Sequence, residues 1–157
     1  MVDISNKQRF PRTLSNRDFG LTADVTLKQY EYIKVGSLTV PAQQYIAWGA
    51  NDIVSGQPQG RTAYIRLDDT SAQLTGVFRL VVTDANETRS VVVLEERSEK
   101  MSADVNDRQK AVLLPEARPL AQEDSKLLIL FACDEASKTV DYDDADTSIK
   151  LPVTVYQ

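Results

Sequence analysis

The chain has 157 residues, of which 42% are hydrophobic and 26% charged, and this is the length and balance of one folded domain. It carries a net charge of −5, one cysteine and no histidine. These numbers exclude an intrachain disulfide and every catalytic or metal centre built on histidine, and they argue against a dedicated nucleic-acid-binding protein, which needs an excess of cations.

Neither a transmembrane helix nor a signal peptide is expected. The longest apolar run, Leu127 to Cys133, is far shorter than the roughly 18 residues that a membrane-spanning helix needs. The first residues, MVDISNKQRFPR, contain no apolar core and no small-residue cleavage site. We therefore expect a protein that is made and stays in the cytoplasm, or inside an assembly built there, with Cys133 as a buried and unreactive thiol.

The first 22 residues differ in charge from the rest of the chain. Residues 1–20 hold four basic and two acidic side chains, a net charge of +2, so the other 137 residues carry −5 − 2 = −7. We interpret residues 1–22 as an N-terminal arm on an acidic domain, residues 23–157. The arm is either a solvated tail or a segment that docks on an acidic neighbour, and its candidate interface residues are Arg9, Phe10, Arg12, Arg17 and Phe19.

The sequence predicts short strands in the first half of the domain. Residues 23–36 alternate apolar and polar side chains with period two, and residues 38–48 form extended sequence that Pro41 divides. Residues 51–60 have the composition of a loop. Residues 61–69 place Ala63, Ile65 and Leu67 on one face, which predicts a half-buried strand.

Two β-branched runs, residues 77–83 and 90–94, flank the polar break DANET and predict a hairpin. We expect its valines, with Phe78, Leu80 and Leu94, to lie in the core. Residues 97–110 are polar and indicate a long surface connection, with a short helix capped by Ser102.

The last third begins with a short strand that Pro115 and Pro119 break. Residues 125–134 are the most apolar segment and predict a central strand. In residues 147–157 the side chains alternate, with Ile149, Leu151, Val153 and Val155 expected to point inward.

About eight strands at intervals near 8–12 residues, with no long amphipathic helix, predict an all-β protein. We expect an antiparallel two-sheet sandwich, specifically a single eight-stranded jelly roll with an extended N-terminal arm. An immunoglobulin-like sandwich is the alternative, but the chain lacks its Cys, Trp, Cys pattern.

One acidic loop has the composition of a cation site. Asp141, Asp143, Asp144 and Asp146 supply four hard oxygen donors within six residues, a ligand set that Ca²⁺ accepts. The loop lacks the glycine and the flanking helices of an EF-hand, so a solvated loop is the competing interpretation. No other cofactor is expected.

Two further groups of side chains have both a functional and a structural interpretation. Glu95, Glu96 and Glu99 could supply a general acid and base, but neighbouring strand residues point to opposite faces, which favours a charged strand end. Four aromatic residues could form a sugar-binding platform or serve as core and interface anchors: Tyr30, Tyr32, Tyr45 and Trp48. Because the chain has no nucleotide, zinc or redox motif either, we do not expect an enzyme.

Several segments together resemble a known family: TVPAQQYIAWGAN, RTAYIRLDD through VVVLEERS, LLPEARPLAQEDSKLLILFACD and VTVYQ. They are similar to the small single jelly-roll capsid proteins of icosahedral viruses that infect thermophilic bacteria and halophilic archaea. The resemblance implies a coat subunit that stands on a lipid vesicle and associates through arms and sheet edges.

The resemblance also implies partners and a location. These are copies of the chain itself, other capsid proteins and an internal membrane surface, without specific nucleic acid, in a virion assembled in the host cytoplasm. A cement or decoration protein of a viral head and a carbohydrate-binding or adhesion module are the alternatives.

Overall fold

The structure is a computed structural model that describes residues 8–41, 45–48, 53–54, 57–58, 62–69, 72–100, 112–113, 124–141 and 148–156. Regular structure in these ranges is β-strand, apart from the single-turn 3₁₀ helix η1 (Ser98–Lys100). None of the described segments contains a helix long and apolar enough to cross a bilayer. The predicted Ser102 cap and the Pro115 and Pro119 breaks lie outside the described residues.

The first large sheet has β15 (Ser148–Tyr156) at its centre. The strand order is β1 (Arg9–Ser15), β15, β7 (Thr62–Arg66), β12 (Val112–Leu113), all antiparallel. The short strand β4 (Tyr45–Trp48) also pairs with β15, at residues 153–156, whereas β7 pairs at residues 148–150. All seven residues of β1 pair with residues 150–156 along one edge of β15. β4 and β7 therefore both pair with the opposite edge of β15.

The second large sheet has the order β11 (Ser90–Arg97), β10 (Gly76–Asp84), β13 (Ser125–Cys133), β3 (Ile33–Val40). All three pairings are antiparallel, and the β10–β13 ladder runs without interruption from Gly76↔Cys133 to Asp84↔Ser125. Two β-bulges interrupt the other pairings, one between β10 and β11 and one between β13 and β3. The predicted hairpin is therefore confirmed, and β13 forms the central strand that was predicted for residues 125–134.

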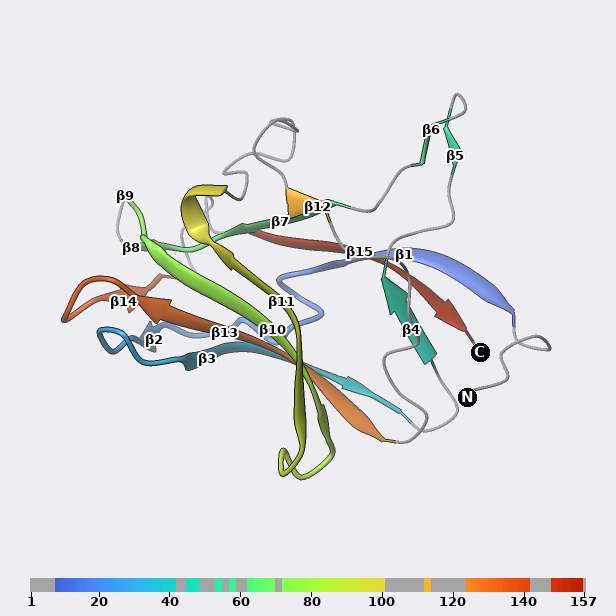
Figure 1. Cartoon of the computed structure of the whole chain (residues 1–157), viewed down its shortest axis with the longest axis horizontal. Helices are drawn as coiled ribbons and strands as arrows, with labels where there is room; N and C mark the ends of the chain where they lie inside the picture. Colours follow the sequence, from blue (N-terminus) through green and yellow to red (C-terminus); the bar gives the residue numbers. More distant parts are fainter. Residues whose placement is uncertain are drawn as a thin grey trace.

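The two sheets form the layers of a sandwich (Figure 1). Along the chain, β1, β7, β12 and β15 belong to one layer, while β3, the β10–β11 hairpin and β13 belong to the other. The chain thus crosses repeatedly between layers. The strand orders β1-β15-β7-β12 and β11-β10-β13-β3 are those of a jelly roll, with β4 as an additional strand beside β15. The prediction of an antiparallel two-sheet jelly roll is confirmed.

Three two-stranded sheets lie outside these layers. They are β2 (Val25–Thr26) with β14 (Thr139–Val140), β5 (Ile53–Val54) with β6 (Gln57–Pro58), and β8 (Asp68–Asp69) with β9 (Ala72–Gln73). The first and third lie at the same end of the sandwich (Figure 1).

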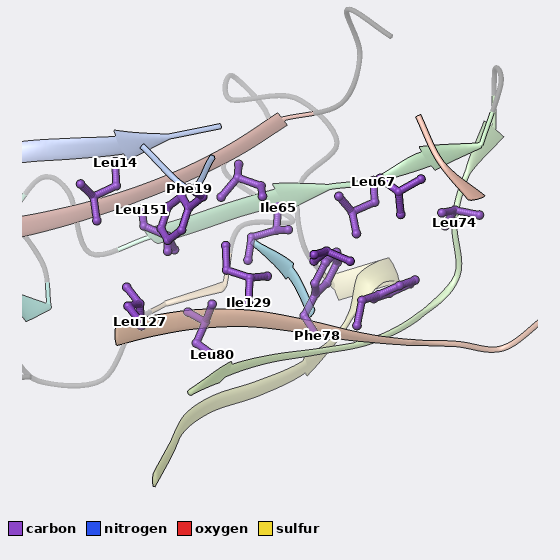
Figure 2. Packing of buried hydrophobic residues seen from close by; sticks show 14 of the residues in the cluster. Leu14, Phe19, Ile65, Leu67, Leu74, Phe78, Leu80, Leu127, Ile129 and Leu151 are labelled. Atoms are coloured by element: carbon purple, nitrogen blue, oxygen red, sulfur yellow. The ribbon is translucent and has the colours of Figure 1, made fainter. Parts of the chain in front are cut away.

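Side chains from both layers fill the interior (Figure 2). Ile65 and Leu151 of the first sheet face Leu80 and Ile129 of the second, and all four are fully buried. The rings of Phe78 and Phe131 lie 4.7 Å apart between centroids, tilted by 39°. Burial of each such side chain contributes about 1.5–3 kcal/mol to folding. The period-two patterns of residues 61–69 and 147–157 predicted Ile65, Leu67, Ile149 and Leu151 correctly as core, and Cys133 is also buried.

One predicted strand is broken in two. Residues 23–36 do not form a continuous strand, because β2 ends at Thr26, β3 begins at Ile33, and Tyr30 between them adopts a left-handed backbone with φ of 58°. The Tyr30 N–H donates to the Cys133 carbonyl at 2.8 Å, and Leu27 N–H donates to Lys138 at 2.9 Å. The chain therefore reverses at Tyr30 to follow the segment after β13.

Candidate functional site

Residues 9–15, expected as part of an arm, form β1 of the first sheet. They pair with β15 from Arg9↔Tyr156 to Ser15↔Lys150, and Leu14 is buried in the core. This pairing joins the two ends of the described chain, so no local pattern in residues 1–22 indicates it.

A closed turn follows β1. The Asp18 carboxylate accepts hydrogen bonds from Ser15 N–H at 2.8 Å and Ser15 Oγ at 3.2 Å, and it forms an ion pair with Arg12. Gly20 completes the turn with φ of +66°, which glycine adopts without strain. The Asn16 side-chain oxygen accepts from Ile149 N–H, which ties the turn to β15.

The turn directs Phe19 into the core, where the residue is only 2% exposed (Figure 2). The Phe19 carbonyl accepts from Ser37 N–H at 3.1 Å, so the segment also lies along β3. Phe19 is therefore part of this molecule's own core rather than an anchor for a neighbour, because the turn of Asp18 and Gly20 returns the chain onto the sandwich.

The other four arm candidates differ in what they offer to a partner. Arg12 is engaged by Asp18, and Arg9 contributes its backbone to the β1–β15 ladder. Phe10 is 43% exposed and Arg17 is also exposed. Phe10 thus presents an apolar ring and Arg17 a cation to solvent, and the Arg12 side chain, though paired with Asp18, is 55% exposed.

Asp84 organises the turn of the β10–β11 hairpin. Its carboxylate accepts from the backbone N–H groups of Thr88 at 2.6 Å and Arg89 at 3.0 Å, and from the Thr88 hydroxyl. The Thr88 hydroxyl and these N–H groups hold the pKa of Asp84 below its ordinary value, because they stabilise the charged form.

Glu87 at the same turn adopts a left-handed backbone with φ of 58°, and its carboxylate pairs with Lys34 at 3.0 Å and with Lys126 at 3.7 Å. The lysines, Lys34 foremost, lower the pKa of Glu87.

The outer part of the hairpin departs from the sequence prediction. Phe78, Leu80 and Val81 of β10 are buried as expected, but Val91 of β11 is 65% exposed and Val92 is 48% exposed. Leu94 is half-buried and packs against the buried core residues without being one of them. The expectation that all the hairpin valines are core is therefore wrong, because β11 is the terminal strand of its sheet.

The three glutamates of β11 and η1 each pair with a cation. Glu95 contacts Arg79 at 2.5 Å, Glu96 contacts Lys100 at 3.5 Å, and Glu99 contacts Arg97 through two bonds of 2.9 and 3.0 Å. Arg97 lowers the pKa of Glu99, whereas a general acid at neutral pH needs a raised one. Glu95 lies across from Arg79 and Glu96 across from Phe78, on opposite faces. This is the predicted charged strand end.

The acidic loop falls largely outside the described residues. Asp141 is half-buried, whereas Asp143, Asp144 and Asp146 are not described. Within the described ranges no group of three or more His, Cys, Asp or Glu side chains has the arrangement of a metal site. Calcium binding by this loop therefore stays a prediction.

Of the four aromatic candidates, the structure describes the side chains of Tyr30 and Tyr32, which lie in different environments. Tyr30 is 75% exposed at its reversed turn, where Gln29 Nε2 also donates to the Asp134 carbonyl at 3.0 Å. The Arg79 guanidinium covers the Tyr32 ring, 3.9 Å from its centroid, as a cation–π contact. Tyr45 and Trp48 lie in β4, and their side chains are outside the described part.

One shallow groove of about 260 Å³ lies between residues 19–25 and β3. Most of its lining residues are small or apolar, and its charged lining residues are Asp24 and Lys34.

No family model matches the chain, and no curated protein matches it by sequence. Solved structures do match. VP17, a capsid protein of bacteriophage P23-77, superposes with a TM-score of 0.62 at 11% identity, over 95% of this chain and 96% of that one. A structure of the VP16-VP17 complex, the two major capsid proteins of the same bacteriophage, gives a TM-score of 0.61 at 12% identity, over 94% of this chain and 98% of the other. At these identities the likeness establishes the fold, and it confirms the resemblance to viral jelly-roll capsid proteins that the sequence indicates.

Proposed function

We propose that this chain is a viral capsid subunit that acts by assembling with copies of itself and with other capsid proteins. The observation that carries the proposal is the end-to-end match to two capsid-protein structures, 94–95% of this chain against 96–98% of theirs. A match of that extent leaves little of this chain for an added domain, so its function lies in the surface of the jelly roll itself.

The proposed role is structural rather than catalytic. The carboxylates singled out as acid–base candidates are held in ion pairs, and Arg97 bridges Glu99 and Asp134. Ion pairs of this kind stabilise a surface without supplying a proton donor at neutral pH. The expected location is the virion, after assembly in the host cytoplasm.

For contacts with neighbours we propose the exposed part of the N-terminal segment. Phe10 supplies an apolar anchor and Arg17 a cation, and the acidic region 134–146 of an adjacent subunit supplies the opposite charge. An internal membrane surface is a further proposed partner, whereas specific nucleic-acid binding is not part of the proposal because the chain is acidic.

Assembly of the purified protein tests this function. We expect concentrated protein, observed by electron microscopy and analytical ultracentrifugation, to form regular rings, sheets or shells. A chain that stays monomeric at about 1 mM over a wide range of salt concentrations would count against a capsid subunit. Binding on a glycan array that disappears with a chelator would instead favour the adhesion module.

A further inference from the structure

Tyr30 is exposed in a backbone conformation that its own side chain disfavours. Its φ of 58° lies in the left-handed region, where an aromatic residue is strained and glycine is not. Backbone groups hold the turn in place, because Tyr30 N–H donates to the Cys133 carbonyl at 2.8 Å. The residue is 75% exposed and therefore contributes little to the core of its own chain. A strained backbone that presents an aromatic ring to solvent points to a contact with another molecule.

Phe10 is a second exposed aromatic residue, near the start of β1, and is 43% exposed. It belongs to a row of apolar residues across three strands, because Phe10 pairs with Val155 of β15 and Val155 pairs with Ile46 of β4. Offset or edge-to-face packing of two aromatic rings is favourable beyond the area that it buries. Phe10 therefore supplies the kind of surface on which a tyrosine ring packs.

The two rings lie at opposite ends of the sandwich. The small sheets β2–β14 and β8–β9 lie at one end, and the Tyr30 turn follows β2 there (Figure 1). Phe10 lies at the other end, where it pairs with Val155 near the last residue of β15 (Figure 1). Tyr30 and Phe10 of one chain therefore cannot touch, and a contact between them needs two copies.

β1 is basic around Phe10. Its first four residues, RFPR, hold two arginines and no acidic residue. The Arg12 side chain is 55% exposed, and its ion pair with Asp18 leaves these residues with a net charge of +1. A guanidinium has five N–H donors, so Arg12 can contact a carboxylate of a second chain while it keeps Asp18.

The segment that binds the Tyr30 turn is acidic. Residues 134–141 hold three acidic side chains and one lysine, a net charge of −2. Residues 28–31 and 97–99, which contact this segment, each add one cation and one anion. Opposite charges at an interface select which patches meet, and like charges oppose the alternatives. The Tyr30 end of one copy therefore favours the β1 end of another copy over a second Tyr30 end.

We propose that Tyr30 of one copy of this chain packs on Phe10 of the next copy, with residues 134–141 of the first against the arginines of β1 of the second. The contact rests on the proposed subunit function and names one of its interfaces. Because it joins two different surfaces, it repeats head to tail and forms a ring where the rotation closes.

Disulfide cross-linking tests which residues meet. The native Cys133 is buried, so an introduced thiol reports on its own position. In a head-to-tail contact Tyr30→Cys alone and Phe10→Cys alone give no linked dimer, whereas their equimolar mixture should give one under mild oxidation. The control is Tyr30→Cys mixed with Val91→Cys, since Val91 is 65% exposed. We expect about fivefold more linked dimer from the first mixture, because a disulfide needs Cα atoms within about 7 Å. Equal yields from the two mixtures would overturn the pairing.

Glycine at position 30 separates the contact from folding. Glycine adopts a φ of 58° without strain, so Tyr30→Gly should melt close to the wild-type temperature. It should nevertheless raise the dissociation constant about tenfold in sedimentation velocity, the loss typical of an interface anchor. Tyr30→Phe keeps the ring and should associate as wild type does. A Tyr30→Gly protein that associates as wild type does would overturn the proposal, and so would one that fails to fold, since the ring would then serve its own chain.

Electron microscopy of the same variants distinguishes this contact from the subunit function. We expect wild type and Tyr30→Phe to form regular assemblies and Tyr30→Gly to form fewer or none under the same conditions. Assemblies of Tyr30→Gly that match those of wild type would overturn the head-to-tail contact and leave the subunit function standing. Failure of wild-type protein to assemble at all would count against the subunit function, and with it against this contact.

Discussion

Gly76 lies directly against the ring of Phe131. A methyl group at Gly76 would come within 2.6 Å of Phe131 Cζ and still closer to the Ala132 carbonyl oxygen. Gly76 N–H also donates to the buried Ser98 Oγ at 3.1 Å. The missing side chain is what allows β10 to approach β13 while Phe131 keeps its contact with Phe78.

Gly76→Ala should therefore lower the free energy of unfolding by about 1–3 kcal/mol, the range found for overpacked cores. The backbone oxygen cannot move aside as a flexible side chain can, so the whole strand pair must shift. Urea denaturation measures the change. Gly20→Ala is the comparison, since nothing lies within 4 Å of its added methyl and only the positive φ opposes it. A Gly76→Ala protein as stable as wild type would contradict the close approach.

Phe19 and Phe10 should respond differently to truncation. Phe19→Ala removes a fully buried ring and should cost about 3–5 kcal/mol of unfolding free energy. Phe10→Ala should cost less than about 1 kcal/mol, because its ring is partly in solvent. Paired denaturation curves measure the two losses. Similar losses would contradict the different placement of the two rings.

Deletions from the N-terminus should show a sharp boundary at Arg9. Removing residues 1–8 leaves β1 intact, so we expect a folded protein with a cooperative thermal transition. Removing residues 1–20 also deletes β1, Leu14 and Phe19, which should abolish cooperative unfolding. Circular dichroism during heating distinguishes the two outcomes. A folded protein lacking residues 1–20 would mean that β1 is not needed by the sandwich.

Asp84 should make hairpin stability depend on pH. Its pKa is lower in the folded protein than in the unfolded chain, so its contribution is fully present above the unfolded value, near 4. The contribution is lost as the pH falls through the folded value. The difference in melting temperature between wild type and Asp84→Ala should therefore shrink from pH 5 to pH 2. Thr13→Ala, far from this turn in sequence, controls for general acid destabilisation. A difference independent of pH would exclude the charged hydrogen bonds.

Period-two patterns identified the core strands because one face of each strand lies on the opposite sheet. Ile65 in β7, Leu67 directly after β7, and Ile149 and Leu151 in β15 alternate with polar residues in the sequence, and all four are buried. The absence of long helical patterns then left a sandwich as the architecture that these strands can build.

The sequence pattern was insufficient where pairing is non-local or where every side chain is apolar. β1 contains the basic residues Arg9 and Arg12 and pairs with β15 at the far end of the described chain, so nothing near it marks a strand. Val91, Val92 and Val93 have no alternation, so the pattern cannot distinguish a core position from an open edge. Tyr30 and Tyr32 do alternate, but hydrogen bonds to the segment after β13 reverse the backbone at Tyr30.

Sequence patterns were also insufficient to tell which candidate interface residues of the N-terminal arm are exposed. Charge and aromaticity identified Phe10 and Arg17, which are exposed, together with Phe19, which is not. The difference arises from the turn that Asp18 closes, and side-chain composition does not reveal which way a turn directs the next residue.

The β1–β15 ladder also constrains the order of folding. β1 is synthesised before every other described strand, and its partner β15 after all of them. Until then β1 and the buried side chains of its turn lack the strand that covers them. Contacts between such distant segments form slowly, and unpaired strands are prone to aggregate meanwhile. Cotranslational folding of this chain should thus remain incomplete until β15 has left the ribosome.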